Sequence, residues 1–90
     1  MYYEILVNGQ TLGVYGHPRV NNMHLSVQVT SEGPEVFASG VCEEQDGLYM
    51  FNWVQQRVLA SDIVTIRPTS STVAAEPRNK YKMRKAEGEA

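Results

Sequence analysis

The fold is decided by residues 36–67, which read VFASGVCEEQDGLYMFNWVQQRVLASDIVTIR. Near the middle of this stretch, Asp46-Gly47 separates two runs in which side chains alternate between two faces. Asp-Gly between such runs favours a two-residue type I′ turn, because both central residues of that turn need φ above zero. We therefore expect an antiparallel β-hairpin here, followed by a short strand at residues 63–67 that ends at Pro68.

The pairing within this hairpin follows from the position of the turn. With Asp-Gly as the two-residue loop, Cys42 lies opposite Phe51, and two residues further along Gly40 lies opposite Trp53. Small residues then lie under large rings, and each ring covers backbone that a glycine leaves bare. A shift of the register by two residues would change the partners but keep both sets on one face. We therefore assign the face that carries the rings to the core.

The opposite face of the hairpin is also largely apolar. It carries Phe37 and Val41 from the first strand and Leu48, Met50 and Val54 from the second. Antiparallel sheets with one solvated face usually alternate more cleanly than this. We therefore expect a cover over this second face, either from the rest of the chain or from another chain.

Upstream of the hairpin the sequence predicts three more strands. Asn8-Gly9 is a second type I′ signal, and strands at residues 2–7 and 10–15 flank it. Residues 23–30 have the most regular pattern in the chain, with apolar residues at odd positions and polar residues at even positions. This alternation predicts a strand with one core face and one solvated face.

The strands together predict an all-β fold. We expect five to six antiparallel strands. Residues 54–59 fit either one helical turn or a strand that continues through a bulge. Consecutive hairpins favour a small open barrel or sandwich formed by residues 1–68. Beyond this domain, a Ser/Thr run, Pro77 and alternating charges lower the density of apolar residues. Residues 69–90 are therefore expected to form a flexible, disordered, charged tail, with a short helix from about Pro77 to Ala86 as the alternative.

Length and charge restrict the function further. A chain of 90 residues makes one small domain, and such a domain buries only about 60% of its unfolded surface, so self-association is a reasonable way to cover more. Residues 1–66 carry seven acidic and two basic side chains, a net −5, whereas residues 67–90 carry six basic and three acidic ones, a net +3. The body is therefore acidic and the tail basic.

The cysteine content and the absence of long apolar runs indicate the compartment. Cys42 is the single cysteine, so no internal disulfide is possible, and no Cys/His spacing indicates zinc. The first residues lack the basic and then apolar pattern of a signal peptide. No apolar run approaches the roughly 18 residues of a membrane-spanning helix. We therefore expect a cytoplasmic bacterial protein that does not contact a membrane.

Several short motifs resemble those of a group of small uncharacterised bacterial all-β proteins. The matching residues are Val7-Asn8-Gly9, Gly40, Trp53, Leu59, residues 62–66 and Glu76-Pro77. Members of that group end in Leu-x-x-Gly-Asp-x-Val-x-Ile, and this chain has Ser61 in place of the Gly. The resemblance implies a small β domain over residues 1–77. No activity, cofactor or partner comes with it.

The sequence predicts no catalytic residue, no metal ligands and no cofactor. His17 lies in a loop and His24 lies on the solvated face of its strand, so we interpret both as surface residues rather than as a metal pair. Cys42 is expected to face the core, with Glu43 and Glu44 as its neighbours. A reactive thiol needs an electropositive setting, so these neighbours argue against a nucleophile.

These observations favour a non-enzymatic protein-interaction module of the accessory or toxin-neutralising type, which can also form a homodimer. Acidic small proteins can cap basic partners by electrostatic complementarity. The predicted contact surface is the second apolar face, at Tyr2, Leu6, Tyr15, Leu48 and Met50.

The alternative function is that of a nucleic-acid-associated small β-barrel. Phosphate binding needs a basic surface, and the basic residues lie mainly in the tail. The candidate contacts, for nucleic acid or for an acidic partner, are Arg78, Lys80, Lys82, Arg84 and Lys85.

Overall fold

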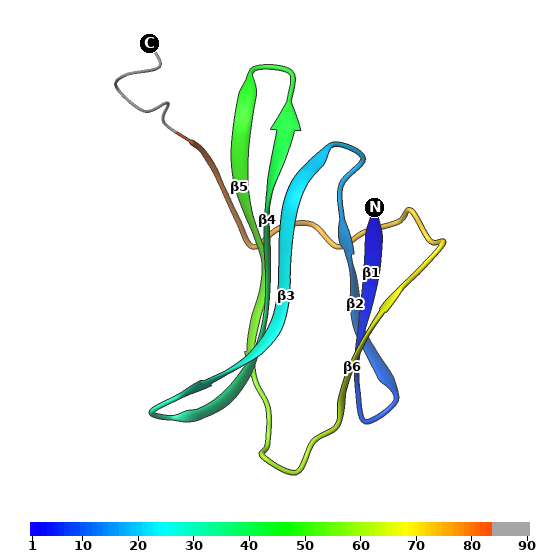
Figure 1. The fold of residues 1–90 in the computed structure, drawn as a ribbon, viewed down its shortest axis with the longest axis vertical. Helices are drawn as coiled ribbons and strands as arrows, with labels where there is room; N and C mark the ends of the chain where they lie inside the picture. The colour runs from blue at the N-terminus through cyan, green and yellow to red at the C-terminus, as the bar shows by residue number, and fades with distance from the viewer. Residues whose placement is uncertain (84–90) are drawn as a thin grey trace.

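The computed structural model describes residues 1–83, and all of the regular elements in this part of the chain are antiparallel β-strands. The strands are β1 (Tyr2–Val7), β2 (Gln10–Gly16), β3 (Val20–Thr30), β4 (Gly33–Glu44), β5 (Gly47–Arg57), β6 (Val64–Pro68) and β7 (Asn79–Lys82). They form a three-stranded sheet with the order β2-β1-β6 and a four-stranded sheet with the order β3-β4-β5-β7. The two sheets face each other as the layers of an open sandwich (Figure 1). The predicted all-β fold is therefore confirmed.

Residues 1–83 form seven strands, whereas the sequence predicted five to six. β5 continues as a strand to Arg57, so the helical turn considered for residues 54–59 is wrong and the strand is correct. The additional strand, β7, lies in the segment predicted as a tail, where it pairs with β5. The helix considered for this segment does not form in the described part of it. Residues 69–78 have no regular secondary structure, and residues 84–90 lie outside the described part of the chain.

The turn between β1 and β2 has the geometry that its sequence predicts. Asn8 has a φ of 53° and Gly9 a φ of 81°. Both central residues therefore have the positive φ that a type I′ turn needs, and both are residue types that tolerate it. The position of this hairpin is confirmed.

The turn between β4 and β5 is displaced from the predicted position. The turn residues are Gln45 and Asp46, and Gly47, with a φ of 137°, pairs with Glu44 as the first residue of β5. The predicted register is therefore wrong by two residues, and Cys42 lies opposite Tyr49. The physical reason is that a turn at Asp46-Gly47 would also need positive φ at Asp46, which this arrangement avoids. Because the shift is even, the face assigned to the core is unchanged.

Trp53 is the extra residue of a β-bulge in β5. Ala38 pairs with Val54 while its neighbour Ser39 pairs with Asn52, so Trp53 has no partner of its own in the ladder. Trp53 is buried, and Val54 packs against the core as well. The predicted position of Val54 on the second apolar face is therefore wrong, because the bulge changes the alternation beyond it.

The core lies between the two sheets. Its buried members are Ile5, Tyr15, Val36, Ala38, Cys42, Phe51 and Trp53. Both sheets contribute to this cluster, and the small residues of β4 lie beneath the rings of β5 as the sequence predicted. The hairpin of residues 36–57 therefore forms most of one wall of the core.

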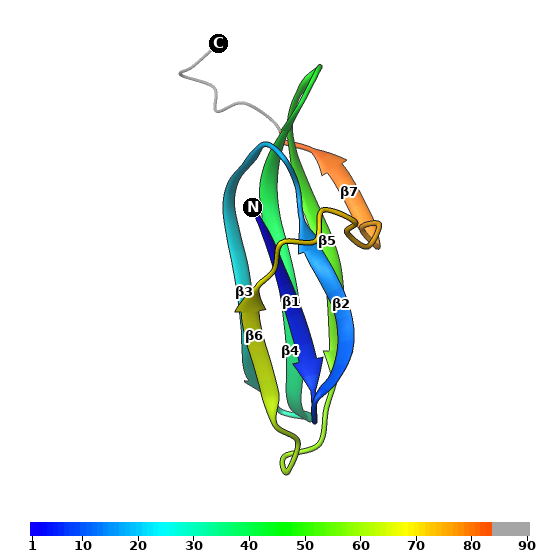
Figure 2. The ribbon, with the colours of Figure 1, turned by 90° about the vertical axis from the view of Figure 1, so that its right-hand side faces the viewer.

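The two long sides of the sandwich differ. On one side, residues 69–78 run from the end of β6 past β2 to the edge of β5, and Ala75 donates a backbone hydrogen bond to Val14 of β2 at 2.8 Å (Figure 2). On the other side, β3 and β6 are the edge strands of their sheets, and no described segment bridges them (Figure 2). The sandwich is thus covered on the β2/β5 side and open on the β3/β6 side.

Residues 1–83 include no helical segment whose length and apolar character would suit a membrane crossing.

Candidate interaction surface at the β3 edge

β3 is a long edge strand with little of the usual protection. It has 11 residues, and in the described structure it pairs with β4 alone. None of its residues is Asp, Glu, Lys, Arg or Pro. Edge strands of soluble proteins normally carry such residues or bulges, because their unpaired N–H and C=O groups can pair with a further strand. The register of β3 shifts between Val20 and Asn22 and is regular from there to Thr30. The edge is therefore uncharged and regular over most of its length.

The C-terminal half of β3 also exposes apolar side chains. Val29 is 84% exposed and Val27 is 44% exposed. Single exposed valines are common on protein surfaces, but these two follow each other on the same face of an unpaired edge. This combination of bare backbone and bare apolar surface favours pairing with another strand.

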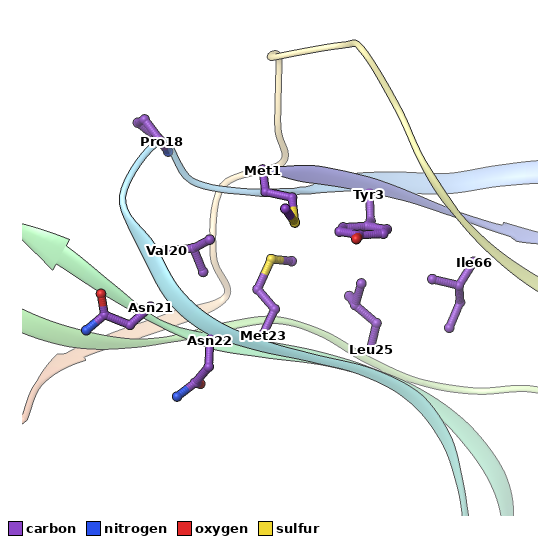
Figure 3. A pocket seen from close by; sticks show the side chains of 9 residues that line it. All are labelled: Met1, Tyr3, Pro18, Val20, Asn21, Asn22, Met23, Leu25 and Ile66. Atoms are coloured by element: carbon purple, nitrogen blue, oxygen red, sulfur yellow. The ribbon is translucent and has the colours of Figure 1, made fainter.

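A cleft lies beside β3 on the open side of the sandwich. It has a volume of about 550 Å³ and is lined by Met1, Tyr3, Pro18, Val20, Asn21, Asn22, Met23, Leu25 and Ile66. Figure 3 shows Tyr3 and Ile66 of the three-stranded sheet pointing toward Leu25 of β3, while Asn22 points away. Side chains from both layers therefore meet in a mostly apolar recess next to the free edge.

A charged cluster lies near the β4–β5 turn and attaches β7. Glu44 of β4 accepts a hydrogen bond from Lys80 of β7 at 2.5 Å and makes another with His17 at 2.8 Å. These two bonds lower the pKa of Glu44 below its usual value of 4.5, and the bond with Lys80 has the larger effect. The Lys80 ammonium also lies 4.9 Å from the centre of the Tyr49 ring and 5.4 Å from that of Phe51. The cluster thus joins the β2–β3 loop, the β4–β5 hairpin and β7.

Cys42 has the surroundings of a core residue. Its side chain is buried, and burial, followed by the negative charge of Glu44, raises the pKa of the thiol to about 11. Such a thiol is almost wholly protonated near neutral pH and is a poor nucleophile. The prediction that Cys42 packs in the core is confirmed.

The two histidines have different surroundings. His17 is bonded to Glu44, which differs from the solvated surface residue predicted, and His24 is exposed on β3 as predicted. Within residues 1–83, no group of three or more His, Cys, Asp or Glu side chains is arranged to hold a metal ion.

Tyr15 was predicted in the contact surface, but it lies in the core at 3% exposure. The prediction is wrong because β2 has a register shift opposite Ile5 and Leu6, which reverses the alternation of its faces along the strand. Beyond the shift, Tyr15 pairs with Tyr3, and its ring lies over Gly13.

The other four predicted contact residues do not form one surface. Tyr2 and Leu6 alternate with the buried Ile5 of β1, so they lie on the outer face of the three-stranded sheet. By the same argument, Leu48 and Met50 lie on the outer face of the four-stranded sheet, away from the core. The two pairs are therefore on opposite sides of the sandwich. Leu6 is 8% exposed, and Leu48 is 39% exposed.

The predicted basic contact residues are partly engaged within the chain. Lys80 pairs with Glu44, and the ammonium of Lys82 lies 3.9 Å from the carboxylate of Asp46. Arg78 donates a hydrogen bond to the backbone oxygen of Gln55 at 3.3 Å. The two remaining candidates, Arg84 and Lys85, lie outside the described residues.

Sequence reasoning missed the β3 edge, although its signal was present. The run from Val20 to Thr30 is the longest strand-like segment without a charged residue. What could not be inferred is that, among the strands of residues 1–83, this one pairs with β4 alone.

A comparison of the chain with known protein families, curated proteins and solved structures finds no match. The resemblance to small bacterial all-β proteins therefore stays a prediction.

Proposed function

We propose that this chain is a non-enzymatic protein-interaction module that binds an extended segment of a protein by strand addition to β3. The observation that carries this proposal is the uncharged and unpaired edge of that strand. In strand addition, backbone hydrogen bonds supply affinity, and pockets for alternate side chains supply specificity.

The cleft beside β3 supplies the pocket for alternate side chains that strand addition needs for specificity. Side chains of an added strand alternate between the two faces of the sheet, so every second one faces the side of β3 on which Met23 and Leu25 line the cleft. Apolar side chains at these positions would cover Tyr3 and Ile66 at the open side of the sandwich. The preferred partner is therefore an extended segment with apolar residues at alternate positions.

Two further features support a module without catalytic activity, and we propose that it works in the cytoplasm. The Cys42 thiol has a pKa raised to about 11, and the Glu44 carboxylate is occupied by Lys80 and His17, so neither is suited to act as a catalyst. A single buried free cysteine also fits a reducing compartment. The accessory or toxin-neutralising role inferred from the acidic body stays a prediction, because β3 itself carries no charge.

Site-specific photo-cross-linking tests the proposal. A photoreactive amino acid is placed at Val29 in β3 or at Val73 in the irregular segment, in cells that produce the full chain. The two positions are matched, since Val29 is 84% and Val73 is 82% exposed. We expect a discrete protein adduct from position 29 and none from position 73. No adduct from position 29, or equal adducts from both, would contradict binding at the β3 edge.

A further inference from the structure

The polarity of the seven central residues of β3, residues 22–28, is symmetric about Leu25. Leu25 is the sixth of the 11 residues in Val20–Thr30. Two positions away on either side lie the apolar residues Met23 and Val27, and one position away lie the polar residues His24 and Ser26. Three positions away the symmetry continues with two amides, Asn22 and Gln28.

This symmetry has a consequence for the pairing of β3 with itself. In an antiparallel pair, residues directly opposite each other lie on the same face of the sheet. A twofold axis at Leu25 therefore places Met23 opposite Val27 of the second copy, apolar against apolar. On the other face it places Asn22 opposite Gln28, amide against amide. No like charges meet, because β3 has no Asp, Glu, Lys or Arg.

The same axis brings the open sides of the two sandwiches together. Because the axis is perpendicular to the joined sheet, both three-stranded sheets lie on the same side of it. The clefts beside β3, each with exposed apolar atoms of Met1 and Ile66, then face each other across the axis. Such an isologous contact is closed, since it uses up the β3 edge of both copies and leaves no β3 edge for a third.

We propose that the occupant of the β3 edge is a second copy of this chain, paired β3 to β3 in antiparallel register about Leu25. The inference rests on the proposed strand addition at β3 and adds the identity of the partner and the register. The product is a twofold homodimer with one continuous sheet of eight strands, four from each copy.

Sedimentation of the purified full chain with charge-swap variants tests the register. In the proposed dimer, Asn22→Lys with Gln28→Lys places lysine opposite lysine twice, whereas Asn22→Glu with Gln28→Lys places glutamate opposite lysine twice. Both positions are exposed, and residue 28 already contacts Glu35, so a lysine there keeps a partner in the fold. We expect wild type to be dimeric. The lysine–lysine variant should dimerise about tenfold more weakly, and the glutamate–lysine variant should recover the dimer.

A third variant separates this interface from the outer face of the four-stranded sheet. Met50→Glu should leave the dimer intact, and circular dichroism confirms that each variant is folded. Equal dimerisation of the two charge variants would overturn the register, and dissociation by Met50→Glu would move the interface to the outer face. If wild type is monomeric and position 29 cross-links to a protein of another mass, the homodimer is excluded but strand addition to β3 is kept. The absence of any cross-link removes both.

Discussion

Gly40 lies where three parts of the structure meet. A Cβ at this position would be 2.8 Å from the backbone oxygen of Asn22 in β3 and 3.1 Å from the Trp53 ring. The first contact is with backbone, which cannot move aside as a flexible side chain can. The glycine thus allows the bulged Trp53 ring to approach β4 closely, and it does so through lack of volume rather than through an unusual φ.

We therefore expect Gly40→Ala to lower the free energy of unfolding by about 1–3 kcal/mol, the usual cost of overpacking a core. Urea unfolding followed by the fluorescence of Trp53, the single tryptophan, measures the change. Ser39→Ala is the control, since it adds no atom at the neighbouring position. A Gly40→Ala protein as stable as wild type would show that both the β3 backbone at Asn22 and the Trp53 ring can shift to accept the added methyl group.

At the scale of elements, β7 depends on few contacts. It has four residues, all exposed, and its attachment includes the pair of Lys80 with Glu44. The pKa of Glu44 is lowered in the fold, first by the bond from Lys80 and then by that with His17. A lowered folded-state pKa means that the carboxylate stabilises the fold above its ordinary pKa of 4.5, and that this stability is lost as the pH falls through the lower, folded value.

Glu44→Gln should accordingly destabilise the protein at neutral pH, with a difference from wild type that shrinks as the pH falls below 4.5. Chemical unfolding at a series of pH values measures this difference. Glu43→Gln serves as the control. It removes the same negative charge, but Glu43 lies on the opposite face of β4, away from Lys80 and His17. A difference that stays constant across this pH range would show that the pair is not the source of the stability.

The strands themselves were largely predictable, and their irregularities were not. Alternation located the hairpins around Asn8-Gly9 and near Asp46 because it is a local property with a period of two residues. The bulge at Trp53 and the register shift in β2 break that period, and the local sequence does not fix the position of either. Val54 and Tyr15 were placed on the wrong face for this reason.

At the scale of the whole molecule, the fold brings basic residues of the C-terminal segment next to acidic residues of the body. β7 places Lys80 and Lys82 beside Glu44 and Asp46 of the β4–β5 hairpin. Positive charges that are paired with carboxylates within the chain are less available to phosphates. This arrangement weakens the argument for a nucleic-acid-binding tail.

We expect the full chain, with its net charge of −2, to show no salt-sensitive binding to a labelled single-stranded oligonucleotide. Fluorescence anisotropy at low and at moderate salt measures it, because phosphate contacts weaken steeply as salt is raised. The variant Glu44→Gln with Asp46→Asn, in which Lys80 and Lys82 lose their partners, is the comparison. Binding by wild type that disappears with salt would restore the nucleic-acid alternative.

The sequence by itself determined the all-β class, the Asn8-Gly9 turn and the face of the central hairpin that forms the core. These depend on φ preferences and on side-chain alternation, which act over a few neighbouring residues. Only the tertiary structure decided that β6 pairs with β1, that β7 pairs with β5, and that no other strand of residues 1–83 pairs with the free side of β3. Such choices depend on which distant segments meet and on what their connections can span. That is why residues 36–67 identify the core, while the surface most suited to a partner is the edge of β3.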